Sequence, residues 1–149
     1  MHTVDTTITI AAPPDTVWEM IVAFDKYHEW NPFILNGEGA PVVGSQLKLE
    51  IQPPGDKAMT HHPTVQVADA GRHLQWLGMV KSQRVFAGRH EFILEPDGAG
   101  TRLRHREYFS GVLVLFLKKT LARTEEGFHA LNQALKERAE QASGVRRVE

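Results

Sequence analysis

The chain has 149 residues, of which 42% are hydrophobic and 23% are charged, and its formal net charge is −1. These proportions argue against a disordered chain, and the near-neutral charge gives no strong field that would attract nucleic acid. There is no cysteine, which excludes disulfide frameworks, thiolate nucleophiles and metal sites built on cysteine. At this length we expect one domain over residues 1–149.

No segment predicts a membrane span. The longest apolar run, Val112–Leu117, falls far short of the roughly 20 residues that a spanning helix needs. The first ten residues lack the basic and apolar regions of a secretory signal. We therefore expect a soluble, cytoplasmic protein without stable membrane insertion.

The N-terminal segment predicts a strand followed by two short helices. Apolar and β-branched residues recur at every second position of 2–11, which is typical of a strand with one buried face. Pro14 suits the first turn of a helix, and apolar residues continue at helical spacing to Phe24. A second short helical turn is expected from Asp25 to Trp30, before Pro32. The alternating residues are Val4, Thr6, Ile8 and Ile10.

The middle of the chain, from Phe33 to Gly111, alternates with a period of two and predicts an antiparallel meander. Clusters of proline and glycine separate its strands. The last two runs flank the turn at 96–100 and predict a hairpin. The alternating runs occupy residues 46–51, 61–67, 74–80, 90–94 and 103–109.

After Gly111 the apolar period becomes that of a helix, which we expect to continue for about thirty residues, as far as Ser143-Gly144. Gly127 predicts a bend or a close backbone approach, because glycine costs a helix about 1 kcal/mol relative to alanine. Residues 143–149 are expected to form a frayed tail. The apolar stripe consists of Leu113, Leu117, Leu121, Thr124, Phe128, Leu131 and Leu135.

This element order predicts an α+β fold. The sheet has an apolar face that must be covered, and the C-terminal helix is the only element long enough to cover it. We expect a curved antiparallel sheet wrapped around the long helix, with two short helices after the first strand. Wherever sheet and helix do not touch, a cavity should remain.

Several short stretches carry a resemblance to a known family. The sequence resembles the SRPBCC superfamily, also called START-like or Bet v 1-like, and its nearest branch looks like the polyketide cyclase/dehydrase-like group. The resemblance covers residues 8 to 135 and implies the helix-grip fold in a single START-like domain. Because the superfamily includes lipid carriers, receptors, cyclases and interaction domains, the resemblance leaves these functions open for this chain. The stretches are Ala12–Trp18, Trp30–Phe33, Gly88–Phe92, Gly100–Leu103 and Glu107–Gly111.

Polar residues on apolar strand faces are the sharpest chemical signal. His90 shares a face with Phe92, while His105 and Glu107 share one with Phe109. If the two strands pair, all three polar groups could enter one cavity, where burial would raise the carboxyl pKa. They could orient a ligand, form a satisfied buried pair, or act as candidate catalytic residues that move a proton.

The other histidines and motifs predict no metal and no cofactor. His61 and His62 are adjacent, so on a strand they would point to opposite faces and could not form a two-histidine site alone. Nucleotide-binding, zinc-protease and serine-hydrolase motifs are missing from the sequence. The histidines expected at the surface or in loops are His2, His28, His73 and His129.

Large apolar side chains are expected either to wall a small-molecule site or to fill the core. Trp18 is the one most expected to be plain core. Phe116 lies off the helical stripe, where it could face a partner or the pocket entrance. The predicted ligand-binding set is Trp30, Phe33, Trp76, His90, Phe92, His105, Glu107, Phe109, Leu117, Leu121 and Phe128.

Three functions follow from these features. The first is binding of a small hydrophobic or amphipathic molecule, such as a lipid, polyketide or aromatic metabolite. The second is a cyclase or dehydrase in which His90 or Glu107 acts as general acid–base. The third is an interaction module, because part of the run Val112–Leu117 could form a dimer contact or a membrane-touching lip.

Overall fold

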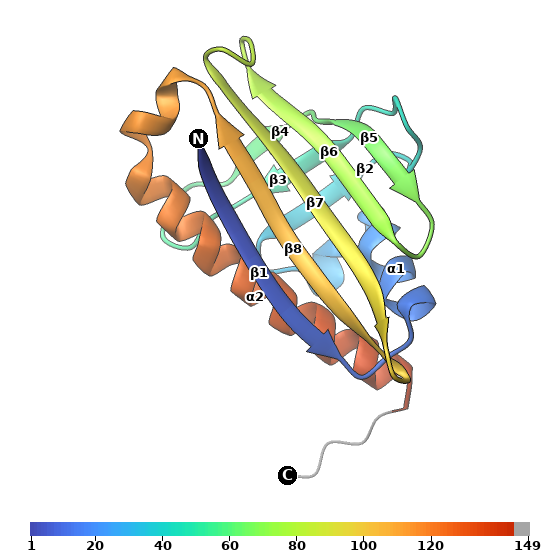
Figure 1. Ribbon diagram of the computed structural model, residues 1–149. Coiled ribbons are helices and arrows are strands. Elements are labelled where there is room, and N and C mark those ends of the chain that lie inside the picture. Colours follow the sequence, from blue (N-terminus) through green and yellow to red (C-terminus); the bar gives the residue numbers. More distant parts are fainter. Residues whose placement is uncertain (145–149) are drawn as a thin grey trace.

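The computed structural model describes residues 1–144, so that 145–149 of the expected tail lie outside it. Figure 1 shows a large antiparallel sheet with the long helix α2 against one of its faces, as the sequence predicted for an α+β helix-grip fold. The elements are β1 (His2–Ile10), α1 (Pro14–Val22), η1 (Phe24–Glu29), β2 (Ile34–Glu38), β3 (Lys48–Ile51), β4 (Met59–His61), β5 (Thr64–Asp69), β6 (His73–Val80), β7 (Phe86–Asp97), β8 (Gly100–Ser110), η2 (Val112–Phe116) and α2 (Lys118–Ala142), where η marks a 3₁₀ helix.

The strands form two connected sheets. The larger has the order β1-β8-β7-β6-β5, and the smaller has the order β2-β3-β4. The segment before β3 joins them, because Leu47 N donates to the carbonyl of Pro63 at 2.8 Å and Gln46 bridges to Thr64. The two sheets therefore border the space beside α2 on two sides.

The predicted hairpin is confirmed as β7 and β8. Its register places His90 opposite Glu107 and Phe92 opposite His105. Since alternate residues of a strand share a face, all four side chains point to the inner face of the sheet. The strands thus deliver the polar residues to the side that α2 covers.

The two short helices after β1 are confirmed, with Pro14 in the first turn of α1. Val17 and Ile21 face the core at a spacing of four residues and are fully buried. Trp18 is half-buried and packs at the edge of the core, so its prediction as plain core was wrong. It lies one position, or about 100°, around the helix from the buried face.

Two predicted elements are divided in the structure. The run 61–67 breaks between β4 and β5, which lie in different sheets, because Pro63 has no N–H for a continuous ladder. The long helix begins at Lys118 instead of just after Gly111, since the preceding η2 is tied to the β6–β7 turn. Backbone N–H groups of Val112 and Leu113 donate to carbonyls of that turn at 3.0 and 3.1 Å.

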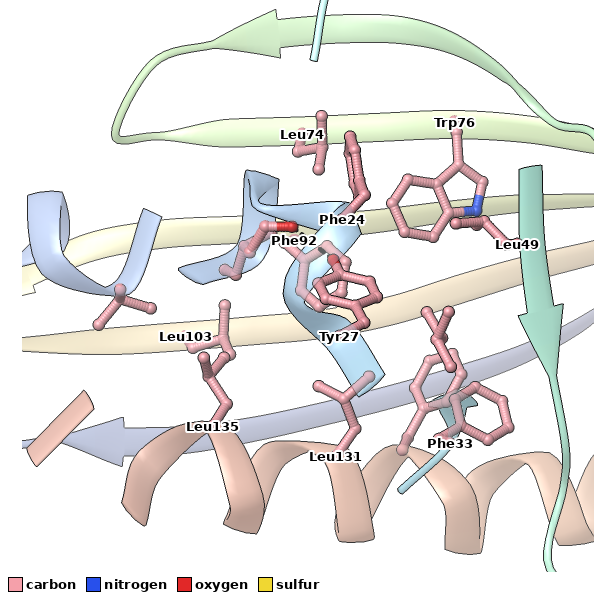
Figure 2. Close-up of a cluster of buried hydrophobic side chains, with 14 of the residues drawn as sticks. Phe24, Tyr27, Phe33, Leu49, Leu74, Trp76, Phe92, Leu103, Leu131 and Leu135 are labelled. Atoms are coloured by element: carbon pink, nitrogen blue, oxygen red, sulfur yellow. Dashed lines mark hydrogen bonds between the residues drawn. The ribbon is translucent and has the colours of Figure 1, made fainter. Parts of the chain in front are cut away.

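The core is concentrated between α1, η1, the middle of the sheet and the second half of α2. Figure 2 shows Tyr27, Leu103, Leu131 and Leu135 converging there, and all are 1% exposed or less. The close approach predicted at Gly127 is also confirmed. A Cβ on Gly127 would lie 2.3 Å from Cδ1 of Phe33, so that only glycine fits without movement of that ring.

Candidate functional site

A cavity of about 590 Å³ lies between the two sheets and the first turns of α2. This volume falls within the 300–1,000 Å³ that is typical of small-molecule sites. Most of its wall is aliphatic or aromatic. The lining residues from the predicted ligand-binding set are Phe33, Trp76, His90, Glu107, Phe109, Leu117 and Leu121.

Four residues of that set lie outside the lining. Trp30 is half-buried and packs against Tyr27, with ring centroids 5.5 Å apart. Phe92, His105 and Phe128 are buried behind the wall, where they stack on one another. Period-two alternation puts Phe92 and His105 on the inner face, but only packing decides which inner-face residues reach the hollow.

Two glycines, which the sequence analysis did not connect with the cavity, make room for it. Gly78 on β6 and Gly88 on β7 are directly opposite each other and both line the cavity. A Cβ on Gly88 would lie 2.3 Å from Oε2 of Glu107, so this glycine lets the carboxyl group lie over β7. For Gly78, which lies inside the predicted run 74–80, a glycine within a strand was the available signal, since it marks a close approach.

A chain of polar contacts leads from the cavity wall to the opposite edge of the sheet. Oε1 of Glu107 is 3.3 Å from Nδ1 of His90, and Nε2 of His90 is hydrogen-bonded to Nε2 of His105 at 2.7 Å. Nδ1 of His105 is 2.7 Å from Oδ1 of Asn132, whose Nδ2 donates to Oγ1 of Thr6 at 2.8 Å. The structure therefore brings the three candidate residues together and adds two that were not predicted.

Asn132 and Thr6 could have been found from the sequence by their positions. Asn132 lies four residues after Phe128 on the helix, next to Leu131 in the apolar stripe, and Thr6 alternates with Val4 on the buried face of β1. A polar residue on a buried face needs a hydrogen-bond partner. The sequence could indicate that need, but it could not supply the identity of the partner.

Aromatic rings fix the planes of both imidazoles. His90 stacks on Trp76 with centroids 4.5 Å apart, and His105 stacks on Phe128 at 3.9 Å and on Phe92 at 4.4 Å. Both histidines are 1% exposed or less. Rotation of either ring would require movement of the packed core, so the nitrogen positions are set by the fold.

Burial controls the charge of these groups. It lowers the pKa of His90 to about 3 and that of His105 well below its usual value, and both imidazoles are therefore neutral near neutral pH. Burial raises the pKa of Glu107 to about 8, against a smaller lowering by the nearby His61. A carboxyl group with this pKa carries a proton at neutral pH.

The remaining histidines are spread over several environments. His61 ends β4 and lines the cavity, while His73 pairs with the buried Glu91 of β7 at 3.2 Å and is only half-exposed. Within residues 1–144 no group of three or more metal-ligating side chains is placed to hold an ion. The histidines at exposed positions are His2, His28, His61, His62 and His129.

The apolar run Val112–Leu117 is divided between the cavity and the outer surface. Leu113 and Leu117 line the cavity, whereas Leu115 and Phe116 are 73% and 79% exposed. In the part of the chain that is described, no helix combines the length and apolar composition of a membrane span. A dimer or membrane contact at this surface stays a prediction.

Solved structures with the same fold are numerous. The ZhuI aromatase/cyclase from Streptomyces sp. R1128 is similar with a TM-score of 0.77, 19% identity and 95% of each chain covered. A START superfamily protein from Mycobacterium smegmatis gives 0.74, with 22% identity, 95% of this chain and 99% of that one. At these identities the likeness shows the fold alone, which is the helix-grip fold that the resemblance implied.

A search of curated protein sequences finds no match. The model of one family does match, over residues 1–140, and that family is described as polyketide cyclase/dehydrase and lipid transport. The match covers every element that builds the cavity, from β1 to nearly the end of α2. The chain therefore belongs to the polyketide cyclase/dehydrase and lipid transport family.

Proposed function

We propose that the protein binds a small, mostly apolar molecule in the cavity between the sheets and α2. The observation that carries the proposal is the hollow of about 590 Å³ with its predominantly aliphatic and aromatic wall. An apolar molecule gains free energy by leaving water for such a wall, at about 25 cal/mol for each Å² that becomes buried. The family to which the chain belongs includes lipid transport in its description, which supports the same function.

Glu107 gives the cavity a polar end. Its carboxyl group lies in the wall formed by β7 and β8, where the side chain is 16% exposed. An amphipathic ligand would place its polar group against Glu107 and its apolar part along Phe109, Leu117 and Leu121. The contact with Glu107 would therefore fix the orientation of such a ligand in the cavity.

Binding can be tested with N-phenyl-1-naphthylamine, a neutral dye whose fluorescence rises in apolar sites. We expect saturable binding to the wild type and at least about tenfold weaker binding to Leu117→Trp, because the indole would occupy the cavity. Leu115→Trp is the matched control, since Leu115 is exposed on the neighbouring turn. Absence of binding to the wild type, or equal binding to both folded variants, would contradict the proposal.

Acid–base catalysis on a carbonyl compound is a second candidate, favoured by Glu107 in contact with His90. A general acid or base works best when its pKa is near the operating pH, and burial raises the pKa of Glu107 to about 8. Dehydration of a β-hydroxy ketone removes a proton from the carbon beside the carbonyl and releases the hydroxyl group as water. Glu107 could take up the first proton or supply the second.

The aldol of benzaldehyde and acetone is a suitable probe, since loss of water gives the strongly absorbing benzalacetone. Catalysis predicts a rate that falls at least about 10²-fold in Glu107→Gln, with dye binding retained. If the rate with wild-type protein equals that in buffer, or is unchanged in Glu107→Gln, Glu107 does not act as a catalyst on this probe.

A further inference from the structure

The hydrogen bonds of Thr6 fix the direction of the polar chain. Oγ1 of Thr6 donates to the carbonyl oxygen of His105 at 2.7 Å, and a carbonyl can only accept. The hydroxyl has a single proton, so its oxygen must accept from Nδ2 of Asn132, which is 2.8 Å away. The amide oxygen of Asn132 is therefore the atom that faces His105, at 2.7 Å from Nδ1.

This arrangement determines where each imidazole carries its proton. Because an amide oxygen only accepts, Nδ1 of His105 is the protonated nitrogen, and in a neutral ring Nε2 then has a free lone pair. Nε2 of His90, at 2.7 Å, must donate to that lone pair. His90 is also neutral, because burial lowers its pKa to about 3, so its Nδ1 has no proton.

Glu107 faces this unprotonated nitrogen. Its Oε1 is 3.3 Å from Nδ1 of His90. A carboxylate oxygen and a nitrogen lone pair would repel each other at this distance in a buried site, whereas a carboxyl O–H directed at the nitrogen is favourable. A protonated Glu107 therefore agrees with the donor and acceptor roles that Thr6 sets along this series of hydrogen bonds.

We propose that the hydrogen bonds linking Thr6, Asn132, His105 and His90 hold Glu107 as a neutral acid, with its proton directed at Nδ1 of His90. As a result, the cavity selects ligands with a hydroxyl group over carboxylates. The second oxygen of Glu107, Oε2, lies over Gly88 and is left as an acceptor. A phenol or alcohol can donate to it. A ketone or ether has no proton to donate, and a carboxylate would bring a negative charge into an apolar wall.

Other polar groups of the cavity do not change this preference at Glu107. Asp56 is paired with Arg123 at 3.2 Å, and Lys57 is exposed. Water screens the charge of the exposed Lys57, so this residue adds little to the affinity for a carboxylate ligand. His61, in the lining, can accept or donate and therefore does not discriminate between a hydroxyl group and an ether.

The inference rests on the proposed function and is tested by displacing N-phenyl-1-naphthylamine near neutral pH. The competitors are 2-naphthol, its methyl ether and 2-naphthoate, which share one ring system and differ in the polar group. We expect 2-naphthol to bind roughly tenfold more tightly than either of the others. Glu107→Gln should retain the preference, because its amide N–H can face His90 and its carbonyl can accept. Glu107→Leu should abolish it.

The outcomes separate the two proposals. If the dye does not bind, the cavity is not a binding site and the proposed function fails. If the dye binds but 2-naphthoate competes as well as 2-naphthol, or the preference survives in folded Glu107→Leu, the inference fails while the proposed function stands. Infrared spectroscopy gives an independent reading without ligand. A protonated-carboxyl stretch should be present in the wild type and missing in Glu107→Gln, and its presence in both would overturn the assignment.

Discussion

Strands β7 and β8 run along the whole space between the sheet and α2. One half of this space is filled by side chains, and the other half is hollow. Toward the turn between β7 and β8, Leu94 and Leu103 pack with Leu135 into solid core. Toward the other end, Gly88 and Phe109 face a hollow of about 590 Å³. Figure 2 shows Leu103 and Leu135 of the filled half, together with Phe33 and Trp76, which also line the cavity.

The difference follows from what lies opposite the sheet. The filled half faces the regular turns of α2 and the two short helices, whereas the hollow half faces the junction where η2 ends and α2 begins. The rings of His90, His105 and Phe128, with centroids 3.9–5.0 Å apart, pack against one another between the two halves. We therefore expect the filled half to contribute most of the free energy of unfolding, and the hollow half to have room for a ligand.

The strongest test of this comparison is to remove equal side chains from each half. Leu135→Ala should lower the free energy of unfolding by about 2–5 kcal/mol, because Leu135 is fully buried and its loss leaves a void. Leu113→Ala should cost about 1 kcal/mol, since Leu113 is half-buried against an existing hollow. Urea denaturation measures both, and equal costs would remove the distinction.

Glu107 in the cavity wall and the two histidines between the halves should affect stability in opposite directions as the pH changes. The pKa of Glu107 rises from 4.5 in the unfolded chain to about 8 in the native state, so the native state keeps a proton that the unfolded state loses. The free energy of unfolding therefore falls as the pH rises through this window. His90 and His105 have lowered pKa values, so stability is lost as the pH falls below about 6.5.

We thus expect a stability maximum near pH 6.5, and Glu107→Gln should flatten the alkaline side and steepen the acid side above about pH 4.5. At pH 8 this variant should be more stable than the wild type by about 2–4 kcal/mol, because its amide does not ionise. Glu95→Gln, at an exposed position of β7, is the matched control and should leave the curve unchanged. If the free energies of unfolding of Glu107→Gln and the wild type change with pH in parallel, Glu107 does not have a raised pKa in the native state.

Gly127 tests the boundary between the halves, because it faces Phe33 in the cavity wall. Alanine is favoured over glycine in a helix by about 1 kcal/mol, yet the added Cβ would lie 2.3 Å from the ring. We expect Gly127→Ala to lose about 1–3 kcal/mol of stability and to weaken dye binding, since the ring must move. Phe33→Leu should reduce the loss in a double-mutant cycle. A stabilised Gly127→Ala protein would show that the ring adapts without cost.

The sequence was sufficient to predict which side chains face the core, because this depends on the local alternation of a strand or the spacing of a helix. Alternation placed His90 and Glu107 on inner faces, and helical spacing placed Leu131 and Leu135 against the sheet. The division of the run 112–117 could not be predicted, because backbone bonds to the distant β6–β7 turn decide it. The cavity itself depends on Gly78 lying opposite Gly88, and a register of this kind is a tertiary property.

The smallest stability effect is expected outside both halves, at the surface of η2. Phe116 is 79% exposed and does not line the cavity, so Phe116→Asp should change the free energy of unfolding by less than about 0.5 kcal/mol and leave dye binding intact. The same variant tests the predicted contact surface. If wild-type protein sediments as a dimer through this residue, Phe116→Asp should sediment as a monomer, because a buried carboxylate at the centre of an apolar contact is costly. A monomeric wild type would leave the exposed ring without a role in self-association, and a destabilised variant would mean that η2 contributes to the core.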